Sequence, residues 1–238
     1  TIVHLAGENI ATARWTDAQK QKIRVSRVDA TRNLVRSLRN CEKPPSTFVC
    51  ASAIGFYGNR GSEEMTESSA PGSGFLPEVC QDWEAAAAEA EELGIRVVRV
   101  RIGVVLSTQG GALAKMLTPF KLCAGGIVGS GKQYWSWIGL SDLVDVLEEA
   151  ITNKDLRGVI NAVSPNTVTN REFTKVLGKV LRRPTLFPLP AFVAKIMLGE
   201  MADDLLLGST RVVPEVLNRS GFEFQYADLE ACLRHELS

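Results

Sequence analysis

Three residues near the start of the chain, Leu5, Ala6 and Gly7, stand where α/β proteins bind small molecules. Leu5 and Ala6 end an apolar run, Ile2–Ala6, that is typical of a buried strand, and Gly7 follows directly. Ligands of parallel sheets bind beyond the carboxyl ends of the strands. A glycine there lets the backbone approach a ligand without a clash from Cβ. An ordinary strand-to-loop turn explains the same residues, and spacing alone does not separate the two interpretations.

A second group of polar residues lies on the long helix that the sequence predicts over Thr16–Arg39. Lys22, Ser26 and Asp29 recur at helical spacing and share one face, and Arg27 lies beside them. Such side chains either contact a ligand or form a solvated charged face, which is the usual role of Lys and Arg on a helix.

Several other patterns exclude particular chemistries. Gly126–Lys132 fits the G-x-x-x-x-G-K pattern, but Gln133 replaces the required Ser or Thr and a strand-like run follows, so we reject a phosphate-binding loop. Five widely spaced cysteines without a C-x-x-C pair indicate reduced thiols. With only two histidines, we expect no metal site, and His4 in its apolar strand is interpreted as a hydrogen-bonded core residue.

Composition narrows the choice of partners. The 238 residues contain 27 Lys and Arg against 27 Asp and Glu, so no basic surplus indicates nucleic acid or an anionic membrane. No apolar stretch approaches the length of a membrane span. We therefore expect a small-molecule substrate, no nucleic acid, no membrane, and a cytoplasmic or organelle-matrix location.

The order of elements predicts an α/β protein with a doubly wound parallel sheet. Strands are expected at Ile2–Ala6, Thr47–Ser52 and Ile95–Arg101, with helices at Thr16–Arg39 and Phe75–Leu93 between them. Beyond these, an aromatic strand is expected over Gln133–Ile138, and the last part is mostly helical. We place the boundary between residues 1–157, a Rossmann-type domain, and residues 158–238, a small helical lobe.

Several motifs in this order resemble the extended short-chain dehydrogenases/reductases. The segments are VHLAG, SRVDATRNLV, CASAIGFYG, RIGVVL and WSWIGLSDLVDVL. More narrowly, LAGENI, FLPEVCQDWE, GGALAKM and AGGIVGSGKQYWSWI resemble the atypical NAD(P)-dependent epimerase family proteins called SDR39U1-like. Each motif is weak alone, but together and in order they cover nearly the whole chain.

The resemblance implies an oxidoreductase that binds NADP(H) rather than NAD(H) and acts on a carbonyl or sugar-like substrate. It implies that Ser52, at the end of its strand, holds the substrate oxygen as the catalytic residue; a serine there is otherwise a common turn former. Cofactor contacts are implied for Leu5, Ala6, Gly7, Lys22, Arg27 and Val105. A guanidinium at Arg27 can reach a phosphate or ribose oxygen.

The chain departs from the pattern of the parent short-chain reductase superfamily at the Tyr-x-x-x-Lys pair, which the related epimerase-like proteins also lack. Leu76 and Cys80 stand at those two positions, and neither performs the acid–base work of a tyrosine and a lysine. Tyr57, outside the pair, is expected to pack or to line the cleft. The departure favours an alternative reading, a non-catalytic NADP(H)-binding regulatory protein, for example one acting in cell or plastid division.

The start of the chain resembles the fourth strand of a dinucleotide-binding sheet. Strand one and its glycine-rich turn would precede it. On this expectation the N-terminal strands are absent from the sequence, which leaves two alternatives. Either the molecule contains residues before Thr1, or it is a shortened form that binds cofactor poorly, in which Ile2–Ala6 is an exposed apolar edge that can pair with another chain as a homo-oligomer.

Overall fold

Four parallel strands form the central sheet in the order β1-β2-β4-β8. The computed structural model describes all residues, 1–238. The strands are β1 (Ile2–His4), β2 (Thr47–Ala53), β4 (Arg96–Ile102) and β8 (Gly158–Ala162). The central strand β2 is buried in all but its last residue, as expected for a parallel sheet covered on both faces, whereas β4 carries Arg96, Arg99 and Arg101 among its buried valines. The predicted α/β class with a Rossmann-like parallel sheet is confirmed.

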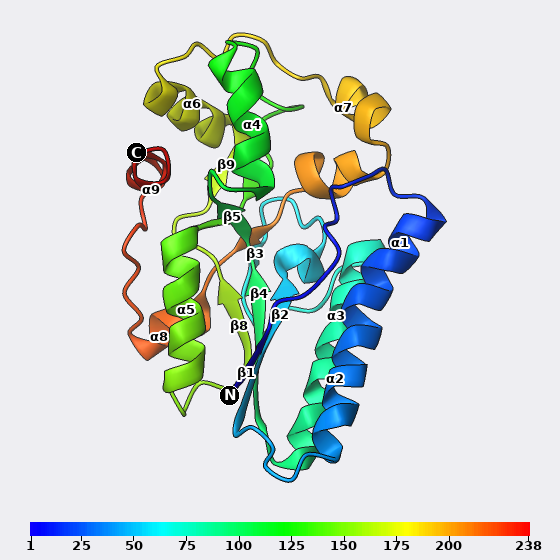
Figure 1. The fold of residues 1–238 in the computed structure, drawn as a ribbon. Helices are drawn as coiled ribbons and strands as arrows, with labels where there is room; N and C mark the ends of the chain where they lie inside the picture. Colours follow the sequence, from blue (N-terminus) through cyan, green and yellow to red (C-terminus); the bar gives the residue numbers. More distant parts are fainter.

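Helices cover both faces of the sheet (Figure 1). On one face lie α1 (Asp17–Arg24), a π-helical turn η1 (Val25–Asp29), α2 (Ala30–Arg39), α3 (Phe75–Ala88) and the 3-10 turn η3 (Glu89–Leu93). On the other lie α5 (Leu140–Thr152) and α8 (Glu215–Ser220). The two resulting cores are separate, one centred on Phe48 and Trp83, the other on Ile160 and Leu217.

The helix predicted over Thr16–Arg39 forms, but it contains the π-helical turn. Thr16 caps its start by accepting a hydrogen bond from the Gln19 N–H. Within the turn, the N–H of Ala30 bonds to the carbonyl of Val25, five residues back instead of four. Isolated π-turns of this kind are frequently found at functional sites.

The upper part of the molecule in Figure 1 is the mostly helical lobe, which faces the carboxyl ends of the strands. Its helices are α4 (Gly111–Lys121), α6 (Asn170–Leu181), α7 (Ala191–Leu198) and α9 (Leu229–Glu236), with a second π-helical turn η4 (Asp203–Leu207). Three two-stranded sheets connect it to the rest: β3 (Glu64–Met65) with β10 (Arg211–Val212), β5 (Val104–Leu106) with β7 (Trp137–Gly139), and β6 (Tyr134–Trp135) with β9 (Val168–Thr169).

Two details differ from the sequence-based expectations. The strand predicted over Gln133–Ile138 is two strands, because β6 pairs with β9 whereas β7 pairs with β5. Between them, the Ser136 hydroxyl bonds the backbone at Thr210 and Val212. The predicted boundary after residue 157 cuts into the sheet, since β8 pairs with β4 and α8 returns to pack on it. The lobe is therefore not one continuous stretch from residue 158.

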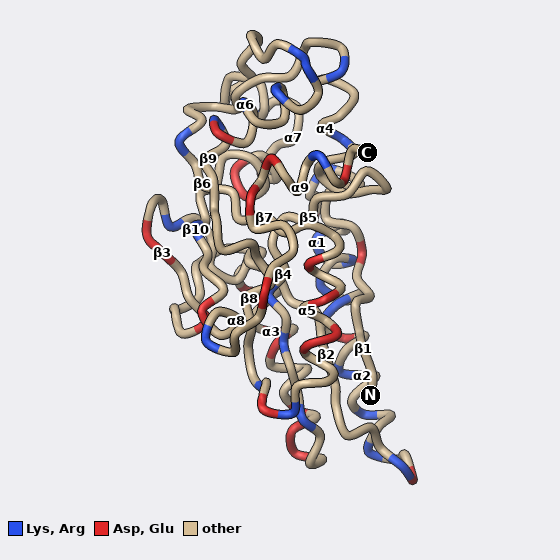
Figure 2. Tube along the Cα trace, turned by 90° about the vertical axis from the view of Figure 1, so that its left-hand side faces the viewer, with Lys and Arg blue, Asp and Glu red and all other residues tan.

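Charged residues of both signs are spread over the structure, and its helices are short or polar. Lys and Arg segments (blue) and Asp and Glu segments (red) are interspersed over the tube in Figure 2. No helix is both long and apolar enough to cross a membrane.

The loop with the G-x-x-x-x-G-K pattern packs against backbone. Its carbonyl at Ile127 and its N–H at Gly129 both bond to Leu189, and β6, not a helix, follows Lys132. A Cβ at Gly126 would overlap the carbonyl of Phe187. Close backbone packing, not phosphate binding, accounts for this glycine.

Replacing Gly126 by Ala should therefore lower the free energy of unfolding by about 1–3 kcal/mol, as expected for overpacking. Gly110→Ala is the matched control, because its backbone is extended and nothing lies within 4 Å of an added Cβ. Urea unfolding of the two variants measures the difference. Equal stabilities would contradict the packing explanation.

His4 is hydrogen-bonded, as predicted, but it is half-buried rather than a core residue, and it joins β1 to the helical layer. Its Nε2 lies 3.1 Å from the Thr31 hydroxyl, and its ring stacks on Phe48 with 6.4 Å between centroids. Burial lowers the pKa of His4 below its usual value.

Because the folded state resists protonation of His4, the unfolded state binds more protons just below pH 6.5, and stability falls as the pH is lowered through that value. In His4→Gln this contribution is absent. Unfolding measured from pH 8 to pH 5 should show the wild type losing stability relative to His4→Gln. A constant difference across that range would refute the assignment.

Candidate active site

Three polar residues lie side by side at the carboxyl edge of the sheet, on three neighbouring strands. Ser52 of β2 is opposite Arg101 of β4, and Arg101 is opposite Asn161 of β8. All three are buried. Parallel register therefore builds a polar layer directly beneath the edge where ligands of such sheets bind.

The centre of this layer is an ion pair between Arg101 and Glu84 of α3. The Nε and Nη2 atoms of Arg101 each lie 2.8 Å from one carboxylate oxygen of Glu84, a bidentate geometry. The Arg101 guanidinium also stacks on the ring of Phe56, 3.3 Å from its centroid. Burial lowers the pKa of Arg101, but hydrogen bonds and charge from Glu84 outweigh it and hold that pKa above its usual value.

Ser52 belongs to the same layer. Its hydroxyl donates to Glu84 Oε1 over 2.6 Å, and only 3% of the residue is exposed. A serine hydroxyl has one proton, so Ser52 can offer an approaching group only its lone pairs while this bond is made. Its catalytic role stays a prediction, and the structure assigns the side chain an internal partner.

Tyr57 completes the layer from the 3-10 turn η2 (Ile54–Tyr57). Its hydroxyl accepts from Arg101 Nη1 over 2.9 Å and donates to Asn161 Oδ1 over 2.7 Å. The residue is fully buried, and burial raises its pKa. Tyr57 therefore packs in the interior, as expected, and is not placed to deliver a proton into a cleft.

Helix α3 presents Leu76 and Cys80 to the turn that follows β2. A Cβ at Gly55 would lie 3.4 Å from Leu76 Cβ and 3.9 Å from Cys80 Sγ. Burial raises the pKa of Cys80 to about 12, so the thiol stays protonated at neutral pH. Neither side chain supplies an acid or a base on this face.

Gly7 and Arg27 are brought together at the end of β1. A Cβ at Gly7 would lie 3.1 Å from Arg27 Cζ. The hydroxyl of Ser26, also in η1, accepts from the Glu8 N–H over 2.9 Å and ties the two segments together. Gly7 itself is exposed, so its backbone is open to a ligand.

The other predicted cofactor residues lie in different surroundings. Leu5 and Ala6 are exposed at the carboxyl end of β1, next to Gly7. Lys22 is exposed on α1. Val105 is half-buried in β5 and packs against the core beneath α5. The structure thus gathers Leu5, Ala6, Gly7 and Arg27, while Val105 stands on a separate small sheet.

The polar layer was missed by reasoning from the sequence. One signal is visible in the sequence: arginines at positions 96, 99 and 101 interrupt the β-branched run of β4. Helical spacing alone does not show that the partner of Arg101, Glu84, lies on the face of α3 that meets the sheet.

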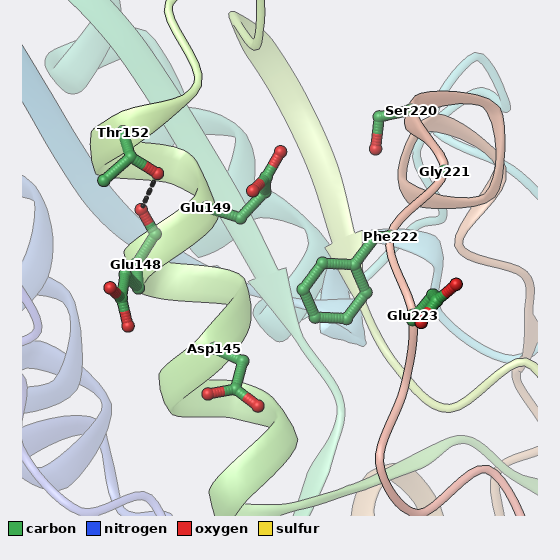
Figure 3. Close-up of a pocket in the computed structure, with 8 residues that line it drawn as sticks. All are labelled: Asp145, Glu148, Glu149, Thr152, Ser220, Gly221, Phe222 and Glu223. Atoms are coloured by element: carbon green, nitrogen blue, oxygen red, sulfur yellow. Dashed lines mark hydrogen bonds between the residues drawn. The ribbon is translucent and has the colours of Figure 1, made fainter.

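An acidic cavity of about 580 Å³ lies elsewhere, between α5 and the segment after α8 (Figure 3). Its carboxylates come from Asp145, Glu148, Glu149 and Glu223. They repel phosphates, and no cluster in the chain is arranged to hold a metal ion. This cavity does not fit a dinucleotide.

Glu84→Gln should lower the free energy of unfolding by about 3–5 kcal/mol, because it leaves the buried Arg101 charge without its partner. Glu89→Gln is the control: its carboxylate pairs with Arg32 at the surface over 3.2 Å, and such pairs contribute about 1 kcal/mol or less. Urea unfolding compares the two. Equal losses in the free energy of unfolding would show that the Glu84–Arg101 pair contributes no more than a surface ion pair.

Comparison with known proteins covers both parts of the chain. The family described as NAD dependent epimerase/dehydratase matches residues 1–162, and a domain of unknown function, DUF1731, matches residues 189–236. Epimerase family protein ML0860 of Mycobacterium leprae is 40% identical over 234 residues, which are 98% of this chain and 76% of that protein. The chloroplastic SDR39U1 homolog of Arabidopsis thaliana is 42% identical, covering 98% of this chain and 67% of its own.

A solved structure agrees with these matches. The crystal structure of human epimerase family protein SDR39U1 (isoform 2) with NADPH superposes with a TM-score of 0.92 at 33% identity, over 98% of this chain and 80% of the human one. Sequence and structure agree that this chain belongs to the NAD dependent epimerase/dehydratase family, among its SDR39U1-like members.

Proposed function

We propose that this protein binds NADP(H) at the carboxyl edge of its sheet and exchanges a hydride with a small carbonyl or sugar-like substrate. The observation that carries the proposal is the pairing of an exposed backbone at Gly7 with the guanidinium of Arg27. When bound, the cofactor would supply or take up the hydride, and the protein would bind and orient it.

The residues at this edge fit a dinucleotide. A side chain at Gly7 would fill the space against Arg27, so glycine keeps a surface on which a ligand can lie close to the backbone. The guanidinium offers donors to phosphate or ribose oxygens. Leu5 and Ala6 extend the same exposed edge, and Lys22 and Val105 are proposed as further contacts on the evidence of the family alone.

The preference for NADP(H) over NAD(H) is supported by two observations. The human relative was solved with NADPH. An arginine at the edge also adds a fixed positive charge, which favours the more highly phosphorylated cofactor.

Ser52 is proposed to hold the substrate oxygen. Its proton is engaged by Glu84, so it would accept a hydrogen bond from a substrate hydroxyl rather than donate one to a carbonyl. With Leu76 and Cys80 on α3, the proton carrier of such a reaction is not the family's usual pair.

A second candidate function is favoured by that same helix. A protein that binds NADP(H) without turnover and responds by changing its affinity for a protein partner needs no acid or base on α3. The protonated thiol of Cys80 and the inward-pointing hydroxyl of Ser52 both support this regulatory alternative.

Calorimetric titration with NADPH and NADH, followed by cofactor turnover with a panel of carbonyl and alcohol compounds, tests the proposal. We expect binding with NADPH preferred, and turnover that is lost in Ser52→Ala. Binding without any turnover would support the regulatory alternative. Absence of binding to either cofactor would refute both functions, and an unchanged rate in Ser52→Ala would remove its catalytic role.

A further inference from the structure

Arg27 is a half-buried cation without an anionic partner. Its Nη1 donates to the Ile23 carbonyl over 3.2 Å and weakly to the Ser26 hydroxyl over 3.5 Å, and no carboxylate lies within ion-pair distance. Glu8 acts on Arg27 only through its charge, and its carboxylate lies 3.4 Å from Gln19 Nε2. By contrast, the buried Arg101 is fully paired with Glu84.

The surrounding chain fixes the position of this guanidinium. Its Cζ lies over the indole ring of Trp83, 5.3 Å from the centroid. Trp83 is itself buried, and its Nε1–H donates to the Thr31 hydroxyl over 3.0 Å. Since the Thr31 hydroxyl also contacts His4, a chain of contacts runs from β1 through α2 and α3 to Arg27.

The π-helical turn contributes to the same arrangement. Both Ser26 and Arg27 lie in it, and both side chains donate to the one carbonyl of Ile23. This leaves Nε and Nη2 of Arg27 without partners, on a guanidinium that borders exposed Gly7. A planar fork of free donors matches the oxygens of a phosphate.

We propose that Arg27 is the phosphate anchor of the dinucleotide, and that Trp83 is its positioning residue. This inference rests on the proposed cofactor binding and names the group that the site recognises. Leaving a charge partly desolvated and unpaired is unfavourable, and a bound phosphate removes that cost. Cys80, close by on α3 and protonated at neutral pH, provides no anion to pair with Arg27.

A double-mutant cycle tests the inference, with the dissociation constant for NADPH measured by calorimetry. Arg27→Gln should weaken binding about 10- to 100-fold, since hydrogen bonds to charged groups are worth about 1.5–3 kcal/mol. Trp83→Leu should weaken it severalfold, and Trp83→Phe, which keeps an aromatic face, should bind close to the wild type. In the Arg27→Gln background, Trp83→Leu should have no further effect, because it acts through Arg27.

Arg36→Gln is the matched control, an exposed guanidinium on α2, and should bind as the wild type does. The salt dependence is a second readout: wild-type affinity should fall more steeply with ionic strength than that of Arg27→Gln, because a phosphate contact is ionic. Equal slopes would overturn a phosphate partner in favour of a neutral ribose contact.

The phosphate-anchor role of Arg27 can be refuted separately from the proposed function. If the wild type binds NADPH and folded Arg27→Gln binds equally well, the anchor is refuted while the proposed function stands. If Trp83→Leu weakens binding as much in Arg27→Gln as in the wild type, the positioning role is refuted. If the wild type binds neither NADPH nor NADH, the proposed function itself fails.

Discussion

The buried ion pair between Glu84 and Arg101 is the interaction on which the ligand-binding edge depends. It joins helix α3 to the centre of the sheet at the level where the strands end. Because a buried charge must keep its partner, the pair fixes how α3 lies across β2 and β4. Ser52, Tyr57 and Asn161 then take their positions from this pair.

A second group of polar atoms, at Gly7 and Arg27, is not internally hydrogen-bonded in this way and forms an open layer. Gly7 and Arg27 border it, and their polar groups are available where those of the lower layer are already satisfied. The lower layer is internally hydrogen-bonded, and the open layer is where we propose that a ligand binds. This division explains how a family member can keep the geometry of cofactor binding while α3 carries Leu76 and Cys80 in place of an acid–base pair.

Local patterns in the sequence were enough to predict the parallel sheet and the helices that cover it. Apolar runs and helical spacing indicate whether a segment is a strand or a helix and where it ends, and these are local properties of the sequence. The Arg101–Glu84 pair joins residues 17 positions apart through the packing of a helix on a sheet, so spacing gave it no signature. The same limitation applies to β8, which reads as the start of a lobe until its pairing with β4 is seen. The π-turn around Arg27 depends on a single displaced hydrogen bond, which side-chain patterns do not reveal.

The central claim is that the cofactor lies across Gly7 with a phosphate on Arg27. A crystal structure of this chain with NADPH tests it most directly. The account predicts a phosphate oxygen within hydrogen-bond distance of the Arg27 guanidinium, with the guanidinium still stacked on Trp83. A cofactor bound elsewhere, or an Arg27 side chain turned away from every phosphate, would contradict it.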